Sequence, residues 1–573
     1  MGNKGGSEAW AFIKQVVAGR WFSVFAGLIM MIGNGTTYVF PTYSKVIKTQ
    51  FDYSQTQINT LGFAKDLGSN IGIIAGLLAE VTPTWVLFII GAFQNFTGFF
   101  LIWLSITARI AKPKFWQMFI LVCFATNSSN WANTAIMVTS VRNFPDRRGI
   151  ILGLLKGYVG IGGAIISQLY LAIYGHNDPS NLVLLFAWLP SLLILILFPS
   201  IRPIRIRKHP DELKVFYQLL YVSILLAIFI LFLTIAQKQV VFSQAGYVGG
   251  ASFVVCLLCV PILIACREEL LLYKLNKQTA APSVALSMLH QNPPTLPTSA
   301  DSEIPEISPS CCPNIWNKPE RGEDFTILQA VFSKDMALIC LATFSGCGSS
   351  LAAIDNLGQV GESLGYSQRA IGILVSWVSI FNFFGRVFSG FISETLMTKY
   401  KLPRPLTFAF AFLITCVGQL FIAYPFPGSL YLAAIIIGFG FGAQNPMLFA
   451  VISEMFGLKR YSTLFNCGQL AAPFGSYILN VDVVGKLYDM EALRERKQIA
   501  GKGLTCTGAH CFGGSFTVLA AATLFGAVVM FVLAYRTREF YKRDVYKNFN
   551  EEIWIPQTEM EFYRLDNKKN IED

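Results

Sequence analysis

The strongest constraint on this chain is that one of its stretches recurs. The first copy spans residues 33–80 and contains Gly-Asn-Gly-Thr-Thr, Tyr-Ser-Gln and Gly-Leu-Leu-Ala-Glu in that order. The second spans residues 346–394 and contains Gly-Cys-Gly-Ser-Ser, Tyr-Ser-Gln and Gly-Phe-Ile-Ser-Glu at almost the same spacing. Both copies lie in apolar sequence. The repeat therefore predicts two related halves, an arrangement in which membrane proteins hold a substrate between parallel repeats.

The composition places these halves in a bilayer. Of the 573 residues, 53% are hydrophobic and only 14% are charged, whereas soluble chains carry about a quarter of charged residues. Continuous apolar stretches of about 20 residues, the length that crosses a bilayer as a helix, recur throughout. We predict an all-α polytopic membrane protein with fourteen spans, at residues 19–42, 56–80, 84–107, 115–141, 149–174, 181–200, 213–236, 245–266, 333–356, 368–394, 405–424, 428–456, 460–485 and 514–536.

The domain organisation follows from these spans. Two spans lack a counterpart in the repeat and form an inserted hairpin, and a stretch rich in Pro, Ser and Thr after it is typical of a disordered linker. The predicted parts are a cytoplasmic N-terminus (1–18), a six-helix bundle (19–208), the hairpin (209–267), a largely disordered cytoplasmic linker (268–332), a second six-helix bundle (333–536) and a cytoplasmic tail (537–573).

Charge sets the expected orientation. The net charge of +11 lies mostly in short loops, which indicates membrane orientation and lipid contact and not nucleic-acid binding. The basic loops after spans four and six predict that both termini are cytoplasmic, although Arg109, Lys112 and Lys114 then lie on the outer side. The plasma membrane is the expected location, with the vacuole or another endomembrane as the alternative.

One cysteine pair stands out from the twelve cysteines of the chain. Cys506 and Cys511 lie in a polar loop on the expected outer side, where a disulfide persists. No His/Cys cluster has zinc spacing, and no nucleophile–base pattern or phosphate loop occurs. We therefore expect no metal, no cofactor and no enzymatic activity.

Lys65 and Asp66 are the most informative charged residues. They lie about ten residues into the second span, hence about 15 Å deep, and charges at such depth face a protein interior or a wet cavity. One interpretation is that Lys65 binds a substrate anion and Asp66 carries a coupling proton. The alternative is an ion pair with other buried groups.

Two further charges lie inside predicted spans. Lys156 is two turns into the fifth span, from where it can reach a central cavity as a substrate-binding residue or extend back to the cytoplasmic surface. Asp355, near the far end of the first span of the second half, is a second candidate for proton coupling. Its alternatives are an outer gate and a simple helix cap.

Uncharged polar side chains inside the spans suggest a hydrogen-bonding cavity, because such groups do not face lipid cheaply. Hydrogen bonds between helices are the alternative explanation. The candidate substrate-binding residues of this kind are Asn34, Tyr38, Asn130, Trp131, Gln444 and Asn445.

Two six-helix halves with a long cytoplasmic connection resemble the major facilitator superfamily. The superfamily's loop motif, Gly-x-x-x-Asp followed by basic residues, is matched in part by residues 76–83 and better by residues 385–404. The first 200 residues resemble the plant nodulin-like branch in Gly62–Gly68, Asn143-Phe144-Pro145 and Lys156-Gly157, and the Cys506/Cys511 loop adds to this resemblance.

The resemblance also implies a cytoplasmic gate made of ion pairs that switch as the halves rock. Arg386 and Glu394 match that gate in the second half, and Glu80 with Arg147 or Arg148 would form it in the first. Glu454 with Arg460 is a further candidate pair.

We expect a monomeric transporter of a small polar solute that works by alternating access. An organic anion, monocarboxylate-like and with proton coupling, is favoured because of Lys65 and Lys156, and sugar transport is the alternative. A non-transporting receptor or scaffold on a transporter fold is the competing function of another class.

Overall fold

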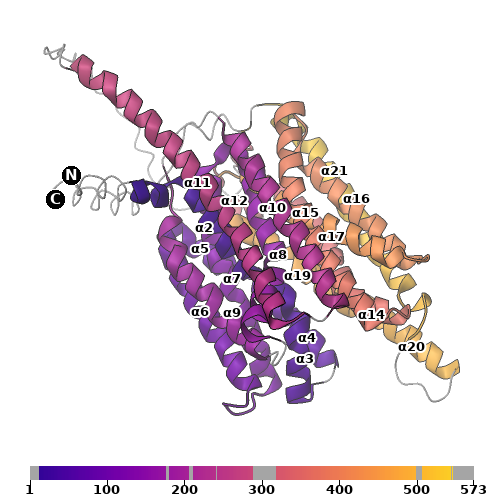
Figure 1. Ribbon diagram of the computed structural model, residues 1–573. Coiled ribbons are helices and arrows are strands. Elements are labelled where there is room, and N and C mark those ends of the chain that lie inside the picture. The colour runs from indigo at the N-terminus through magenta and orange to yellow at the C-terminus, as the bar shows by residue number, and fades with distance from the viewer. Residues whose placement is uncertain are drawn as a thin grey trace.

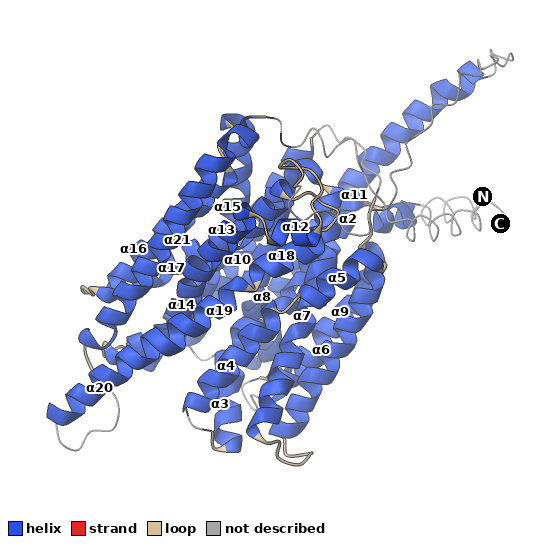
Figure 2. Cartoon of the chain, turned by 180° about the vertical axis from the view of Figure 1, so that it is seen from behind, coloured by secondary structure: helices blue, strands red, loops and turns tan. Residues whose placement is uncertain are grey.

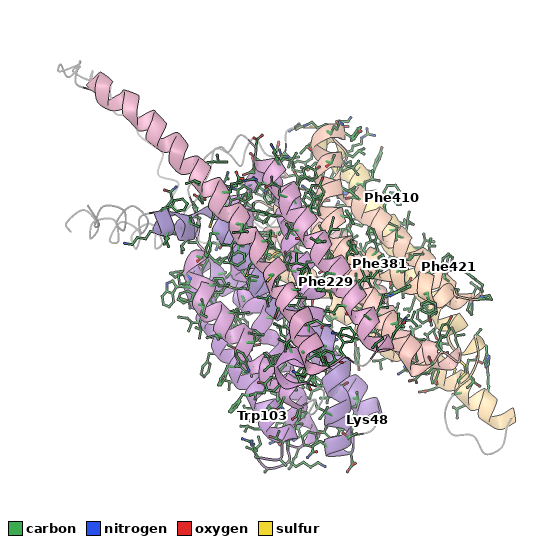
Figure 3. All side chains as sticks on the ribbon, viewed as in Figure 1. Lys48, Trp103, Phe229, Phe381, Phe410 and Phe421 are labelled. Carbon is green, nitrogen blue, oxygen red and sulfur yellow. A yellow bond between two sulfur atoms is a disulfide. The ribbon has the colours of Figure 1, made fainter. Side chains whose placement is uncertain are left out.

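The computed structural model describes residues 12–53, 55–175, 180–204, 211–240, 242–287, 318–498, 506–543 and 545. Within these residues the regular secondary structure is entirely helical (Figure 2). Two bundles lie side by side, one from the first half of the chain and one from the second (Figure 1). Apolar side chains such as Phe410, which is 51% exposed, cover their outer faces (Figure 3). The predicted all-α membrane architecture is confirmed.

The first bundle contains the expected six spans, several of them interrupted. Its elements are α2 (Arg20–Gly33), η1 (Asn34–Val39), α3 (Phe40–Phe51), α4 (Gln55–Asn70), α5 (Ile73–Val81), α6 (Thr84–Ile106), α7 (Phe115–Asn143), η2 (Pro145–Arg147), α8 (Arg148–Tyr174), α9 (Ser180–Leu197) and η3 (Phe198–Ser200). The first span thus continues to Phe51, beyond its predicted end at residue 42.

The second bundle repeats this order. Its elements are α12 (Ile327–Val331), α13 (Lys334–Ala342), η4 (Thr343–Cys347), α14 (Gly348–Ser363), α15 (Gln368–Tyr400), α16 (Arg404–Ala423), α17 (Ser429–Met455), α18 (Tyr461–Gln469), α19 (Ala471–Tyr477), η5 (Ile478–Gly485), α20 (Lys486–Gln498) and α21 (His510–Lys542). The segments η4 and η5 are π-helical, whereas η1 is a 3₁₀ helix.

The sequence repeat has the same packing role in both halves. A Cβ on Gly35 would lie 2.6 Å from the backbone of Gly163 in the fifth span of its own half, and one on Gly348 would lie 2.7 Å from Gly475 in the corresponding span of the other. Such distances leave no room for a side chain. Both glycines lie in or beside a segment that departs from the α-helix, η1 or η4.

The repeat also explains how the halves meet. A Cβ on Gly76, in the second span of the first half, would lie 2.7 Å from the backbone of Ser462 in the fifth span of the second half. The equivalent glycine, Gly390, packs in the same way against Gly149 and Gly153 in the first half. The interface between the halves is therefore pseudo-symmetric, and small residues bring the backbones together.

The inserted hairpin consists of α10 (Glu212–Gln239) and α11 (Gln244–Ser287). It is tied to the first bundle by the Arg20–Glu212 ion pair at 2.8 Å and by two reciprocal amide hydrogen bonds between Gln168 and Gln237. Helix α11 projects beyond the bundles in Figure 1 and extends 20 residues past the predicted end of the hairpin at residue 267.

The predicted linker is also ordered at its other end. Asp324 accepts hydrogen bonds from the backbone of Leu458 and Lys459, each at 3.0 Å, and Gly322 donates one to the carbonyl of Met455. Residues 318–332 are thus docked on the second bundle, which corrects the predicted boundary of the linker. The amino-acid composition of this stretch does not reveal the docking, because the hydrogen bonds that hold it go to the backbone of a loop far away in the sequence. Residues 288–317 lie outside the described part of the chain.

Eleven helices of the described chain are long and apolar enough to span a membrane, and twelve if the bent pair Phe12–Ala18 and Arg20–Thr36 is one span. The predicted count of fourteen is not reached by this criterion. Helix α7 and the α18–η5 segment also cross the bundles, but their polar residues keep their mean hydropathy below this criterion. The protein is a multi-pass integral membrane protein.

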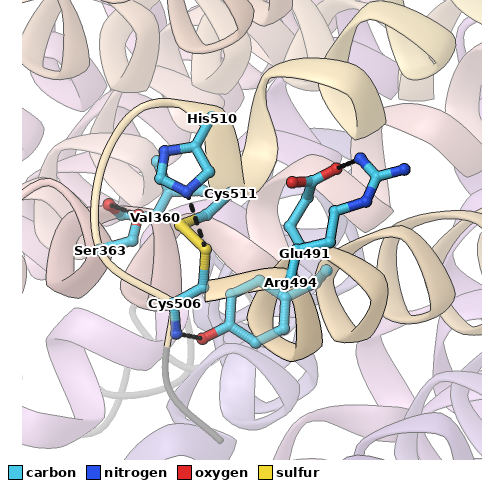
Figure 4. The surroundings of a disulfide bond; sticks show 8 residues. Val360, Ser363, Glu491, Arg494, Cys506, His510 and Cys511 are labelled. Carbon is cyan, nitrogen blue, oxygen red and sulfur yellow. Dashed lines mark hydrogen bonds and ion pairs between the residues drawn. A yellow bond between two sulfur atoms is a disulfide. The ribbon is translucent and has the colours of Figure 1, made fainter. Parts of the chain in front are cut away.

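The bundle has two distinct ends. The basic end carries Arg148 and Arg404, which begin α8 and α16, and Arg460, which precedes α18. The ribbons of the two halves meet there (Figures 1 and 2). The disulfide end carries the predicted Cys506–Cys511 bond, which the structure confirms (Figure 4). Gly508, between the cysteines, donates a 2.8 Å hydrogen bond to the carbonyl of Ser363, so the bonded loop is attached to the end of α14.

Candidate functional site

The basic end is closed by buried charges that cross between the halves. Arg404 binds both Glu394 at 2.6 Å and Glu454 at 2.5 Å, and all three side chains are almost fully buried. Glu394 also accepts a 3.0 Å hydrogen bond from the backbone of Gly149 in the opposite half. Arg148 crosses in the other direction and donates a 3.0 Å bond to the carbonyl of Ser453. The cluster therefore holds α8 of the first half against α15 and α17 of the second.

A second inter-half contact lies on the pseudo-symmetric side. Glu80, at the end of α5, binds Arg460 at 2.7 Å and also accepts hydrogen bonds from the hydroxyls of Ser462 and Thr463. This geometry corrects two expected pairs. Glu80 binds Arg460 and not Arg147 or Arg148, and Glu454 binds Arg404 and Tyr541 and not Arg460. Each carboxylate binds the cation that the packing of the two bundles brings closest to it. The order of the residues in the sequence does not show which cation that is.

Lys156 lies in this closed interface. Its ammonium donates a 3.0 Å hydrogen bond to Asn133 and lies 4.2 Å from the ring centroid of Phe449 in the opposite half. Arg386 donates a 2.8 Å bond to the carbonyl of Lys156 and a 2.6 Å bond to Asn382. Lys156 is only 6% exposed, so it neither extends to the surface nor lines an open cavity in this conformation.

The interface thins towards the membrane centre. Asn466 donates to Thr134 at 3.1 Å, and Gln469 donates to Asn70 at 2.7 Å, each across the two halves. Asn70 and Gln469 lie where helices break: the second span is interrupted between α4 and α5, and the fifth span of the second half between α18 and α19. Helix breaks at this depth are typical of transporter sites, because freed backbone groups are tolerated only where protein or water satisfies them.

Three charges meet at this level. Lys65 and Asp66 pair with each other at 2.8 Å, and their side chains are 13% and 15% exposed. Asp355, from α14 of the other half, lies close enough for its charge to act on both. Its side chain is exposed, although Ala353 before it and Asn356 after it are buried. The three residues form the charge cluster, which spans the gap between the halves.

Two groups surround the charge cluster. The hydroxyl of Tyr43, whose side chain is 1% exposed, lies near Lys65 and Asp66 and has no hydrogen-bond partner among the described side chains. Phe63 and Tyr477, from opposite halves, have ring centroids 4.6 Å apart. Phe63 precedes Lys65 on α4, so this ring contact lies between the halves on the disulfide-end side of the charge cluster.

Three of the six predicted uncharged candidates form hydrogen bonds between helices within one half. Asn130 donates to the carbonyl of Gly68 at 2.9 Å, and the Trp131 ring nitrogen donates to Gln94 at 2.6 Å. Gln444 donates to Ser350 and Thr415 and is fully buried. The alternative explanation therefore holds for these three.

Of the remaining candidates, Asn34 makes a 3.4 Å contact with the sulfur of Met31, and Asn445 is half-buried. The side chain of Tyr38 lies outside the described part.

The sequence reasoning missed three participants. Arg404 falls just before the predicted span 405–424, although it is the centre of the basic-end cluster. Asn70 and Tyr43 were not considered. The sequence does give a partial signal for Asn70, because this residue lies one turn after Asp66 on a helix that carries buried charge.

Metal-ligating side chains come together at one place among the described residues, Cys506, His510 and Cys511. Because the two cysteines are joined in a disulfide, their sulfurs are not thiolate ligands in this form of the protein.

Comparison with known proteins agrees with this geometry. Residues 20–266 match the family model described as Nodulin-like, and residues 330–543 match that of the NFD4 C-terminal domain. The proton:xylose symporter XylE, in a structure with 6-bromo-6-deoxy-D-glucose, superposes with a TM-score of 0.51 at 12% identity over 91% of this chain and 96% of XylE. The chain carries a nodulin-like domain, and its fold is that of the major facilitator superfamily.

Curated relatives support the assignment over the whole length. This nodulin-like protein is 25% identical to Protein NUCLEAR FUSION DEFECTIVE 4 of Arabidopsis thaliana, over 91% of the chain and 90% of the relative. It is 21% identical to the Probable transporter MCH1 of Yarrowia lipolytica over 37% of the chain and 44% of that protein. The likeness to XylE shows the fold alone, which is that of a membrane transporter.

Proposed function

We propose that this nodulin-like protein is a secondary transporter that moves a small polar solute by alternating access, with the charge cluster as its central site. The observation that carries the proposal is the position of Lys65, Asp66 and Asp355, where two pseudo-symmetric halves face each other. Charges are expensive at this depth and are retained where they act on a substrate or ion.

The charges of the cluster favour proton coupling. One lysine faces two aspartates, so the three groups carry a net charge of −1 when all are ionised. A net charge between two apolar bundles is costly, because the interior screens it poorly. A proton on either aspartate removes this charge, and Asp355 is the more accessible of the two.

An organic anion fits the cluster only after protonation. In the ionised state Lys65 is already paired with Asp66 at 2.8 Å, and an incoming carboxylate would meet two negative charges. With a proton on each aspartate, the cluster carries one unpaired positive charge on Lys65, which can pair with one carboxylate. We therefore propose that protons bind before a monocarboxylate-like solute, and that the two leave together.

The closed basic end and the Phe63–Tyr477 contact define the first step of the cycle. Solute enters from the disulfide end, where two rings separate it from the site. Opening of the basic end then requires the bonds of Glu80, Glu394 and Arg148 across the halves to break. Because the basic loops favour a cytoplasmic position for this end, we propose import towards the cytoplasm.

The test is uptake into proteoliposomes that contain the purified chain, with a panel of radiolabelled monocarboxylates and sugars at several external pH values. We expect monocarboxylate uptake that increases as the external pH falls, and its loss in Lys65→Ala. Asp66→Asn is expected to weaken the pH dependence, because Asp355 still takes up a proton, while solute exchange continues. Sugar uptake that is independent of Lys65 would reject the anion, and no uptake of any solute would reject transport.

A further inference from the structure

A groove of about 540 Å³ lies at the basic end, outside the central site. Its walls are α5 of the first half and α12 of the second, which flank α18 (Figure 2). The walls are apolar, and several of the side chains are strongly exposed: Ile74 is 65% exposed, Val81 68% and Leu328 52%. Volumes of 300–1,000 Å³ are typical of small-molecule sites, so the groove can hold an elongated apolar chain.

The groove has a charged end. Glu80 and Arg460 both line it, and Arg460 contributes a side chain that is 40% exposed. A guanidinium has five N–H donors, and among the described residues only one nitrogen of Arg460 is engaged, by Glu80. Lys459 adds a second positive charge beside it in the sequence. The exposed donors are therefore suited to a phosphate, which arginine binds through charge-assisted hydrogen bonds.

We propose that this groove is a binding site for an anionic phospholipid, with an acyl chain between α5 and α12 and the headgroup phosphate on Arg460. The occupant follows from the location. The apolar side chains Ile74, Val81 and Leu328 that line the groove are exposed on a membrane-spanning protein, where lipid is the apolar molecule at hand. Arg460 is the cation among the described lining residues. Basic pockets at membrane-facing grooves recognise anionic headgroups in the same way.

The site is placed to influence the equilibrium between conformations. Arg460 holds Glu80 across the halves, so a phosphate competes with Glu80 for the same guanidinium. The lipid would weaken one bond that closes the basic end. Binding itself does not depend on transport, and the two proposals fail independently.

The experiment is native mass spectrometry of the full chain after extraction from vesicles of equal parts phosphatidylglycerol and phosphatidylcholine. We expect about tenfold more phosphatidylglycerol than phosphatidylcholine to remain bound, as charge-assisted hydrogen bonds predict. Arg460→Gln is expected to remove the preference. Glu80→Gln is expected to keep or increase it, although both variants break the same ion pair.

Two filling variants test the groove itself. Leu77→Trp and Leu328→Trp place a large ring in it and should abolish retention of either lipid. Leu225→Trp, at a 54% exposed position on α10, is the control and should retain lipid as the parent does. Monodisperse elution of each variant confirms folding. Equal retention of the two lipids by the parent, or unchanged retention in both filling variants, would overturn the proposal.

Discussion

At the scale of single residues, the charge cluster determines what the protein can do. Lys65 and Asp66 were expected to be functional because of their depth in the second span. Their position next to Asp355 depends on the packing of the two halves and could not be read from the sequence. Asp355 lies two turns before the end of α14, so it is not a helix cap.

Asp355→Asn tests the charge balance directly. The amide removes one negative charge and cannot take up the coupling proton, so we expect proton-driven uptake to fall about tenfold, an effect of roughly 1.4 kcal/mol. Uptake by the parent should rise as the external pH falls, because protonation of Asp355 relieves the net charge. The variant should lose part of this rise, since Asp66 still takes up a proton.

Asp489→Asn, on the exposed face of α20, is the matched control for that measurement. It should behave as the parent does at every pH. A pH response in Asp355→Asn equal to that of the parent would show that another group carries the proton.

At the scale of elements, the boundaries of most spans were predictable from apolar length, but the breaks inside them were not. The 3₁₀ segment η1 and the π-helical segments η4 and η5 arise where glycines of one helix pack on the backbone of another. The sequence shows the glycines, but it does not show which helix each one faces.

Gly475→Ala should destabilise the protein because the added Cβ would lie 1.9 Å from the carbonyl oxygen of Phe344 in η4. Overpacking of this kind costs about 1–3 kcal/mol, and a decrease in the unfolding temperature in detergent measures it. Gly514→Ala is the matched control. Its Cβ meets nothing within 4 Å, so the unfolding temperature should stay the same or rise slightly.

The disulfide at the start of α21 gives another element-scale prediction. Cys506 and Cys511 close a loop with a sequence separation of five residues, for which loop-closure entropy predicts about 2 kcal/mol. The double variant Cys506→Ser with Cys511→Ser should unfold at a lower temperature than the parent under non-reducing conditions. With a reductant the two proteins should unfold alike; a difference that persists would contradict this origin of the effect.

At the scale of the whole molecule, the duplicated sequence predicted the architecture best. The two halves, the inserted hairpin and the small-residue interface follow from repeats and apolar lengths. The sequence predicted charged residues of the gate but not how they pair, because Glu80 binds Arg460, which lies in a distant part of the chain. Polar residues such as Asn130 and Gln444 bond between helices, and composition does not distinguish such positions from cavity-facing ones.

The inter-half bonds at the basic end and the Phe63–Tyr477 contact towards the disulfide end lead to one expectation for the whole molecule. The two ends should open in alternation, since the same rigid halves cannot separate at both ends around a shared central contact. A ligand that binds the central site must then change both ends in opposite directions.

The most direct test measures distances between spin labels across the halves at both ends of the molecule. One label pair at Thr49 and Glu362 reports on the disulfide end, and a second at Val81 and Lys401 reports on the basic end; all four side chains are exposed. On addition of solute at low pH, the account predicts a shorter distance at the disulfide end together with a longer one at the basic end. Distances that stay fixed, or that change in the same direction at both ends, would contradict alternating access around the Lys65–Asp66–Asp355 cluster.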